Sequence, residues 1–341
     1  ATIDCISVPR CAGNLLQGFR YLVLMTATTL KKSSHSCHKL DVKMLERYVK
    51  GLSTACDENK IIKDTCDRKC KCVNGDLQSC SRVRKEFTKM SLEERTRFIN
   101  AFKLVSTDPR YKDDYRKLTI MYSQIPSNIL TQTPHIFLPW YRGYLLELEN
   151  ILRQIDCRIT MPYWDWSIDA AHWTRDSEIE DVWNSGPHGL GGNGVFPDMC
   201  VMDGPFKKGE FFLPWYASGG CLKRNFNQSC NLPNAEDVQT LQEKENFTVF
   251  VEVIREVFLW KIRDCVGESM QNILTATFTP EFWLHHTFID KLWAKWERHI
   301  IERQLVHYRN TTFKMPGLER FAWEYMSLNT LPGGVIVVYE E

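Results

Sequence analysis

The stretch Thr279–Trp296, TPEFWLHHTFIDKLWAKW, is the most informative part of the chain. Thr279 can cap a helix and Pro280 suits the first helical position, so we predict that a helix begins here. Large side chains recur at alternating spacings of four and three residues, as on one buried helix face: Phe282, His286, Ile289, Trp293, Trp296 and Ile300. A histidine on such a face is either a hydrogen-bonded core residue or part of a metal site.

This stretch resembles the second copper-binding helix of the type 3 copper proteins, the tyrosinases and molluscan haemocyanins. The family phrase reads D-P-x-F-x-L-H-H-x-x-x-D-x-L-W-x-x-W. Every fixed position is matched except the leading aspartate, which is Thr279 here. By this pattern, His286 is the copper ligand of the pair His285 and His286.

A second stretch, Phe137–Leu145, reads FLPWYRGYL and resembles the family's first copper-binding helix, F-L-P-W-H-R-x-Y-L. Tyr141 stands where that phrase has its ligand histidine. We predict that Pro139 opens this helix. The phrase PYWDW at Pro162–Trp166 follows, as it does in the family. The resemblance covers about residues 65–300 and implies a mainly α fold, in which a central four-helix bundle carries long irregular loops pinned by disulfides.

The resemblance implies two copper ions, each bound by three neutral imidazoles. For the first copper, the implied positions are about Pro126, then Gln132 and Tyr141, and none of them is a histidine. His135 is out of register with Gln132 by three residues.

For the second copper, the phrase at Val266–Met270 places the first two ligands at about Leu259 and Arg263. An arginine keeps its proton and has no lone pair to offer. At most one of six ligands, His286, is therefore kept. We expect a copper-free pseudoenzyme with no phenol oxidation by the dicopper mechanism.

Such a protein would act by binding a small aromatic or anionic ligand or an extracellular protein. The former copper cavity would be lined by Gln132, Tyr141, Arg263, His286, Trp260 and Trp283. The alternative for these residues is a filled core. A second hypothesis is an oxidoreductase with a rebuilt metal site around His286 and His135, with His285. A third is an extracellular structural or assembly protein.

The composition excludes several other classes. Among 341 residues the formal net charge is +1, so nothing indicates a nucleic-acid partner. No apolar run approaches the ~20 residues that span a bilayer. The chain begins at Ala1 without a hydrophobic leader, and we expect that any signal peptide has been removed.

Thirteen cysteines are the strongest compositional signal. They are Cys5, Cys11, Cys37, Cys56, Cys66, Cys70, Cys72, Cys80, Cys157, Cys200, Cys221, Cys230 and Cys265. Such density predicts disulfides and an oxidising compartment, although a zinc site within Cys66–Cys80 is an alternative. With the sequons at Asn227, Asn246 and Asn310, it indicates a secreted glycoprotein. The odd count leaves one thiol free or linked to another chain.

We expect two parts, a Cys-rich disulfide-stapled segment over residues 1–80 and a tyrosinase-like domain over residues 81–341. Helices are predicted over 40–52, after Ser91 with its capping box, over 111–122 and over 246–266. The last is expected to bury Phe250, Val253, Val257, Trp260 and Ile262. Residues 185–234 read as a long irregular connection, and residues 333–339 as a short strand.

Overall fold

A computed structural model of the protein describes residues 56–57, 59–125, 133–168, 170–174, 181–214, 219–309 and 314–341, with the side chains of 299–309 outside the description. The chain separates into two compact units, Ala1–Ala55 and Cys56–Glu341. The helix predicted over 40–52 lies outside the described residues, as do Cys5, Cys11 and Cys37. The account below concerns the second unit.

Helices dominate this unit. The α-helices are α3 (Leu92–Thr107), α4 (Lys112–Gln124), α6 (Pro134–Ile155), α8 (Ala235–Gln242), α9 (Phe247–Val253), α10 (Trp260–Val266), α11 (Glu268–Gln271) and α12 (Pro280–Arg309). A π-helical segment, Ile254–Leu259, joins α9 to α10. Single 3₁₀ turns lie at Phe87–Lys89, Ala276–Phe278, Ala322–Tyr325 and Pro332–Gly334. The strands are β1 (Ile61–Lys63), β2 (Lys69–Val73), β3 (Asp76–Arg84), β4 (Gly194–Val195), β5 (Cys200–Val201) and β6 (Ile336–Tyr339).

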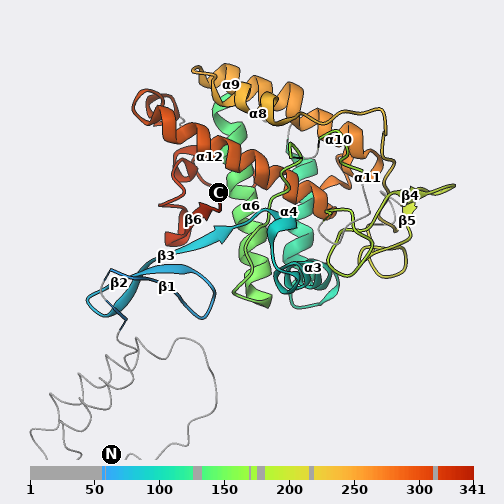
Figure 1. Ribbon diagram of the computed structural model, residues 1–341, viewed down its shortest axis with the longest axis horizontal. Helices are drawn as coiled ribbons and strands as arrows, with labels where there is room; N and C mark the ends of the chain where they lie inside the picture. The colour runs from blue at the N-terminus through green and yellow to red at the C-terminus, as the bar shows by residue number, and fades with distance from the viewer. Residues whose placement is uncertain are drawn as a thin grey trace, which may run out of the picture. The chain divides into compact units, whose positions relative to one another are not determined.

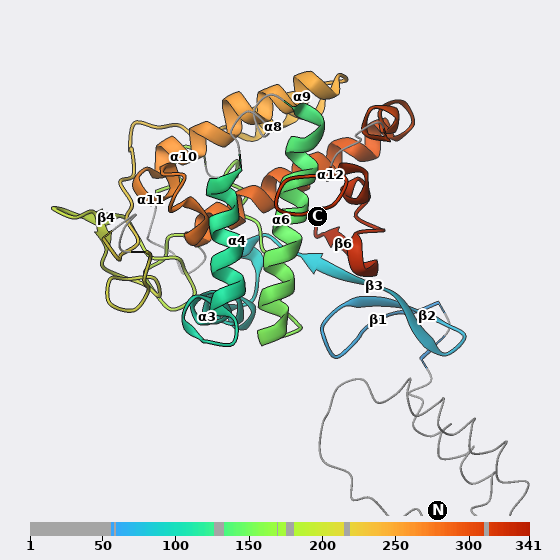
Figure 2. The same cartoon turned by 180° about the vertical axis from the view of Figure 1, so that it is seen from behind.

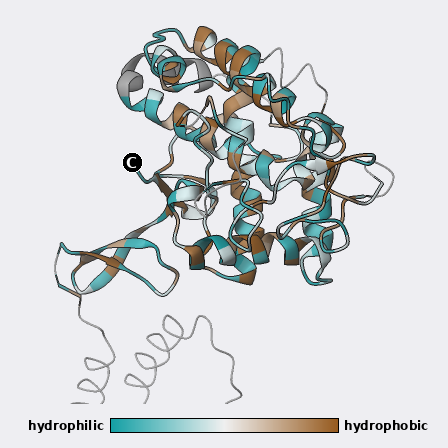
Figure 3. Cartoon of the chain, turned by 45° about the vertical axis from the view of Figure 1, so that its right-hand side comes forward, coloured by the Kyte–Doolittle hydropathy of each residue, from teal (hydrophilic) through white to brown (hydrophobic). Residues whose placement is uncertain are grey.

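Four helical elements form the central bundle: α4, α6, the continuous run from α9 to α10, and α12. Figure 1 shows α12 crossing α6 near the middle of the domain, and Figure 2 shows α4 alongside α6 from behind. Hydrophobic and hydrophilic residues are mixed along the helices (Figure 3). The expectation of a mainly α fold with a central four-helix bundle is confirmed.

The predicted start of α12 is confirmed. Thr279 Oγ1 accepts a hydrogen bond from the Phe282 amide at 3.4 Å, and Pro280 is the first helical residue. The predicted single buried face is too narrow, since every residue from Pro280 to Asp290 is buried. A helix that is covered on all sides belongs in the middle of a core.

Helix α6 begins at Pro134, five residues before the predicted start at Pro139. Pro134 suits the first helical position as well as Pro139 does. Pro139 then lies inside the helix. Because proline has no N–H, the carbonyl of His135 loses its helical hydrogen bond there. The helix tolerates this loss near its end because Ile136–Leu146 is buried throughout.

The helix predicted over 246–266 exists, but its predicted buried face is only partly right: Phe250 and Ile262 are buried and Val253 is half-buried. Val257 and Trp260 are 45% and 44% exposed, whereas Phe258 and Leu259 are buried. The π-helical segment accounts for the difference, because one extra residue per turn shifts the face that follows it. This shift brings the consecutive residues Phe258 and Leu259 both toward the core.

A four-stranded sheet of order β1-β2-β3-β6 flanks the bundle. Strands β1, β2 and β3 are antiparallel neighbours, and β6 pairs with β3 in parallel, which confirms the short C-terminal strand. The expected boundary after residue 80 is wrong, since it falls inside β3. Residues 56–80 belong with the bundle because their strands and the Cys66–Cys157 disulfide join them to it.

Five disulfides pin the irregular segments. The pairs are Cys56–Cys72, Cys66–Cys157, Cys70–Cys80, Cys200–Cys221 and Cys230–Cys265. All four cysteines of the zinc alternative are thereby paired, which excludes it. The long connection over 185–234 holds the Cys200–Cys221 disulfide and is tied to α10 by Cys230–Cys265, as its cysteines predicted. Within the described residues, no helix is long and apolar enough to cross a bilayer.

Candidate functional site

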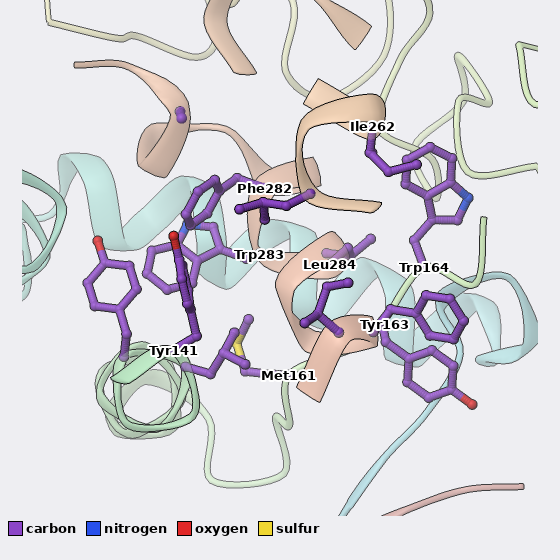
Figure 4. Close-up of a cluster of buried hydrophobic side chains, with 14 of the residues drawn as sticks. Tyr141, Met161, Tyr163, Trp164, Ile262, Phe282, Trp283 and Leu284 are labelled. Atoms are coloured by element: carbon purple, nitrogen blue, oxygen red, sulfur yellow. The ribbon is translucent and has the colours of Figure 1, made fainter. Parts of the chain in front are cut away.

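The structure brings four of the predicted site residues together in the bundle. Tyr141 comes from α6, Arg263 from α10, and Trp283 and His286 from α12, and all four are buried. Figure 4 shows Tyr141 beside Phe282 and Trp283, with Ile262 of α10 in the same cluster. Trp260 covers Arg263 from outside, with its ring 5.0 Å from the guanidinium carbon. Gln132 lies outside the described residues.

Tyr141 and Phe282 enclose His286. The ring of His286 lies 4.3 Å from that of Tyr141 and 4.0 Å from that of Phe282, both in edge contact. The Tyr141 hydroxyl lies 3.2 Å from the Tyr122 hydroxyl of α4. Burial holds the pKa of Tyr141 well above its usual value, so the phenol stays neutral. A neutral phenol is a poor substitute for an imidazole ligand.

Arg263 is held by neutral oxygens. Its Nε donates to the Met270 carbonyl at 3.1 Å and an Nη to the Gln271 carbonyl at 2.8 Å. The other Nη lies 3.4 Å from the Tyr122 hydroxyl. Among the described residues, no carboxylate pairs with this buried guanidinium. Its charge is therefore shared by carbonyl dipoles and the face of Trp260.

The adjacent histidines are neutral and incompletely bonded. His285 Nδ1 accepts a hydrogen bond from Trp166 Nε1 at 3.1 Å, which leaves the proton on its Nε2. Burial and then Arg263 lower the pKa of His285 to about 3, and burial lowers the pKa of His286 well below its usual value. Within the described residues, neither Nε2 has a hydrogen-bond partner.

These residues do not fit a type 3 copper centre. Where the resemblance expects imidazoles, Tyr141 offers a neutral phenol, Leu259 no donor atom and Arg263 a cation. The one cluster of three or more metal-ligand groups within the described ranges is Asp64 with Cys70 and Cys80. Those two cysteines form a disulfide and cannot ligate a metal.

The structure does not gather His135, His285 and His286 into the alternative metal site. His135 stacks on Phe247, with ring centroids 5.8 Å apart. His285 already uses Nδ1 for Trp166. Their ligand atoms do not lie within the 4.8 Å of one another that a shared ion needs.

Buried charges around Asp290 fix the bundle beneath the site. Arg142 Nε donates to Asp290 at 2.6 Å, and Arg84 donates to Asp290 at 3.2 Å and to Glu149 at 3.1 Å. These contacts identify Asp290 and Arg142 as supports of the bundle. Asp165 accepts hydrogen bonds from the Ser167 hydroxyl and amide.

Sequence reasoning missed Tyr122, Phe258 and the bond from Trp166 to His285. Tyr122 ends the predicted helix over 111–122, and its position gave no sign of Tyr141 or Arg263 as neighbours. Phe258 reaches the Trp166 ring at 5.3 Å only because of the π-helical segment. The phrase PYWDW did mark Trp166 as notable without indicating its partner.

Comparisons with known proteins agree with this architecture. Residues 114–299 match the family described as the common central domain of tyrosinase. A tyrosinase of Streptomyces glaucescens is 31% identical over 236 residues, which covers 63% of this chain and 82% of that protein. The solved structure of a polyphenol oxidase from Thermothelomyces thermophila shares the fold with a TM-score of 0.61 at 20% identity, over 89% of this chain and 94% of that one. A functional unit of octopus haemocyanin gives a TM-score of 0.50 at 15% identity, over 76% and 68%. The family match over residues 114–299 covers more than half of the chain, which shows that the chain belongs to the tyrosinase family.

Proposed function

We propose that this protein is a copper-free member of the tyrosinase family that acts by binding rather than by oxidising phenols. One observation carries the proposal. Tyr141, Leu259 and Arg263 occupy the inward positions where the family phrases imply imidazoles, and all three are buried. The relative from Streptomyces glaucescens is a tyrosinase by name. The proposal distinguishes this chain from it by the residues at these three positions.

Electrostatics supports the proposal. Arg263 places a permanent positive charge beside the two histidines and contributes to lowering the pKa of each. The same positive potential opposes the entry of a copper cation. His286 alone supplies one imidazole nitrogen, which is too few donors for either copper of the pair.

The buried site has more hydrogen-bond donors than acceptors, and this indicates the class of ligand that would bind there in place of copper. Arg263 has no carboxylate partner within the described ranges, and the N–H on His285 Nε2 has no acceptor there. A buried donor without an acceptor, such as this N–H of His285, is unfavourable by about 1–3 kcal/mol. A small ligand with an anionic or aromatic group would supply the missing acceptor, and we propose this class for the site.

We also propose that the protein is secreted and glycosylated. Five disulfides are typical of an oxidising compartment. Asn227 and Asn246 are exposed, as a glycan acceptor must be. Asn310 lies outside the described residues.

Metal analysis tests the copper-free proposal. The protein is purified without chelators, offered Cu(II), desalted and measured for bound copper, with its spectrum recorded in air. The tyrosinase of Streptomyces glaucescens serves as the positive control. We expect copper well below one ion per chain and no copper–oxygen absorption. Two coppers per chain would overturn the proposal, and one tightly held ion would support the rebuilt metal site.

A separate experiment tests ligand binding. Benzoate combines an aromatic ring with a carboxylate and is a suitable probe. We expect it to raise the melting temperature of the wild type and to have no effect on Arg263→Met, compared at equal concentrations of chloride. An equal response in both proteins would rule out binding at Arg263.

A further inference from the structure

A small cavity lies on the sheet side of the domain, apart from the residues of the degenerate copper site. Its volume is about 90 Å³, well below the ~300 Å³ at which pockets for drug-sized ligands begin. Its lining comes from β1, β2, β3, α3 and the loop after α6. Such a volume suits one compact chemical group rather than an extended molecule.

Cations outnumber carboxylates in the lining. Five basic side chains contribute to it: Lys63, Lys69, Lys85, Arg97 and Arg158. Three acidic side chains contribute: Asp67, Glu94 and Glu340. Beneath them, Val83, Phe98 and Ile159 form an apolar floor. Charges above an apolar floor are less well screened by water than charges on an open surface.

Most of these charges are already engaged. Lys85 donates to Glu94 at 2.7 Å. Arg97 lies 3.4 Å from Asp156, and Arg158 donates to Asp156 at 2.7 Å. The two lysines of the sheet differ from these, because Lys63 has a loose pair with Asp67 at 3.9 Å and Lys69 has no ion pair within the described ranges.

Lys63 and Lys69 are direct cross-strand partners in the β1–β2 ladder. Partners in an antiparallel ladder point to the same face, with Cβ atoms about 4.5–5.5 Å apart. Both lysines are exposed, whereas the neighbouring Cys70 faces inward. Like charges directly opposite each other are destabilising. Proteins keep such destabilising pairs of like charges mainly at functional sites, where a bound ligand relieves the repulsion.

The strands that carry the lysines are fixed in place. The Cys66–Cys157 disulfide ties the β1–β2 turn to the loop that bears Arg158. The Cys70–Cys80 disulfide joins β2 to β3 immediately beside Lys69. Figure 3 shows this ribbon with alternating hydrophilic and hydrophobic segments, as expected where one face is open to solvent. The backbone positions of the two lysines are thus held opposite each other before any ligand arrives.

We propose that this cavity binds a single tetrahedral oxyanion, a sulfate or a phosphate group, bridged by Lys63 and Lys69. The ion would provide the acceptors that both ammonium groups lack, and Arg158 lies at the same rim. Glu340, which makes no ion pair within the described part of the chain, lines the same cavity and favours one compact anion over an extended polyanion in direct contact. The site is independent of the proposed function, since it uses none of the residues around His286.

The anion can arrive free or as an ester on a larger molecule. Three probes separate these sources: inorganic sulfate, inorganic phosphate, and a sulfated dextran set against unsulfated dextran. Calorimetry at constant low ionic strength gives the affinity of each for the full-length protein. Binding of the free ions identifies a free-ion site. Binding of sulfated dextran alone identifies an ester carried by a glycan.

A pair of double variants tests the residues. In the test variant, Lys63→Gln and Lys69→Gln remove the cross-strand pair. In the control, Lys112→Gln and Lys117→Gln remove two exposed lysines of α4, so that the net charge is the same. We expect the affinity of the bound probe to fall about tenfold in the test variant and less than about twofold in the control.

A thermal measurement gives an independent reading. Without the probe at low ionic strength, the test variant should melt at or above the wild-type temperature, because a repulsion has been removed. Added sulfate should raise the wild-type melting temperature more than an equal ionic strength of chloride, and the test variant should lose this difference. Failure of all three probes to bind, or equal loss of affinity in both double variants, would overturn the proposal.

Discussion

Two buried arginines, Arg142 and Arg263, have different surroundings and therefore different roles. Arg142 is surrounded by acceptors of opposite charge and lies over Trp293, 3.6 Å from the ring centroid. Arg263 has only carbonyls, a hydroxyl and an indole face within the described ranges. The first arrangement supports the fold, and the second is open to an additional acceptor.

Replacement of Arg142 by methionine should strongly destabilise the protein. The change removes the cation that pairs with Glu297 and one of the two that pair with Asp290. Breaking a buried pair typically lowers the free energy of unfolding by about 3–5 kcal/mol. Urea unfolding followed by tryptophan fluorescence measures the loss. Arg110→Met is the control, because Arg110 pairs with Asp108 while 70% exposed. A similar small change in both variants would contradict the supporting role of Arg142.

Glu297 should make stability depend on pH. Burial raises the pKa of Glu297 from 4.5 to about 7, an effect that Arg142 only partly offsets. The folded state therefore keeps a proton that the unfolded chain has lost, and the free energy of unfolding falls as pH rises from about 4.5 to about 7. Glu149 affects stability in a different pH range. Its pKa is lowered to about 2, so it contributes stability that is lost only as the pH falls below about 4.5.

The pH dependence of unfolding in Glu297→Gln tests this expectation. Glutamine cannot ionise, so the decline in stability between about pH 4.5 and about pH 7 should become shallower than in the wild type. Glu256→Gln, at a side chain that is 66% exposed, is the control. The role assigned to Glu297 does not hold if the wild type and Glu297→Gln show the same slope.

At the level of single residues, the sequence predicted which side chains are buried at the site better than it predicted which side chains they contact. The phrases around Tyr141 and His286 placed both on inward helix faces, and both are buried. The sequence could not show that Tyr122 meets Tyr141 or that Arg263 reaches the Tyr122 hydroxyl. Those contacts depend on how the helices pack, and spacing along one helix does not determine packing between helices.

Among the elements, the π-helical segment Ile254–Leu259 has the greatest effect on the site. It allows Phe258 to reach Trp166 and Leu259 to fill the position expected of a ligand. The prediction of a regular helix over 246–266 could not find it, because a periodicity of 3.6 assumes that no residue is inserted. The starts of α3 and α12 were easier to predict, since Ser91 and Thr279 cap these helices by local hydrogen bonds.

Deletion of Val257 should be tolerated far better than deletion of Lys261. A π-helical segment behaves as an α-helix with one residue inserted, so removal of the exposed Val257 can restore a regular helix without turning α10. Removal of the exposed Lys261 instead rotates the residues after it by about 100° and withdraws Ile262 from the core. Thermal unfolding should show a modest loss for the first variant and no cooperative transition for the second. Equal losses would count against the inserted-residue interpretation.

For the whole molecule, the cysteines divide between the two units. All ten cysteines from Cys56 onward are paired. The odd thiol of the chain therefore belongs to Cys5, Cys11 or Cys37. The sequence predicted an odd thiol but could not place it, since pairing follows from distances between residues far apart in the chain.

Thiol labelling tests this assignment. The unreduced full-length protein is denatured, alkylated and mapped by peptide mass. We expect the label on peptides that contain Cys5, Cys11 or Cys37 and on no others, with complete labelling after reduction as the control. If none is labelled and a dimer appears on a non-reducing gel, the odd cysteine links two chains, as the assembly hypothesis requires. Label on Cys56 or any later cysteine would contradict the described pairing.

The parallel pairing of β3 with β6 also bears on biosynthesis. It brings together Arg84 and Tyr339, which are 255 residues apart. A nascent chain thus exposes one bare edge of β3 until β6 has been synthesised, and bare strand edges invite aggregation. The sheet therefore closes only after more than 250 further residues have left the ribosome. A truncated chain that stops before Ile336 would leave this edge of β3 open, and such a product is a natural substrate for cellular quality control.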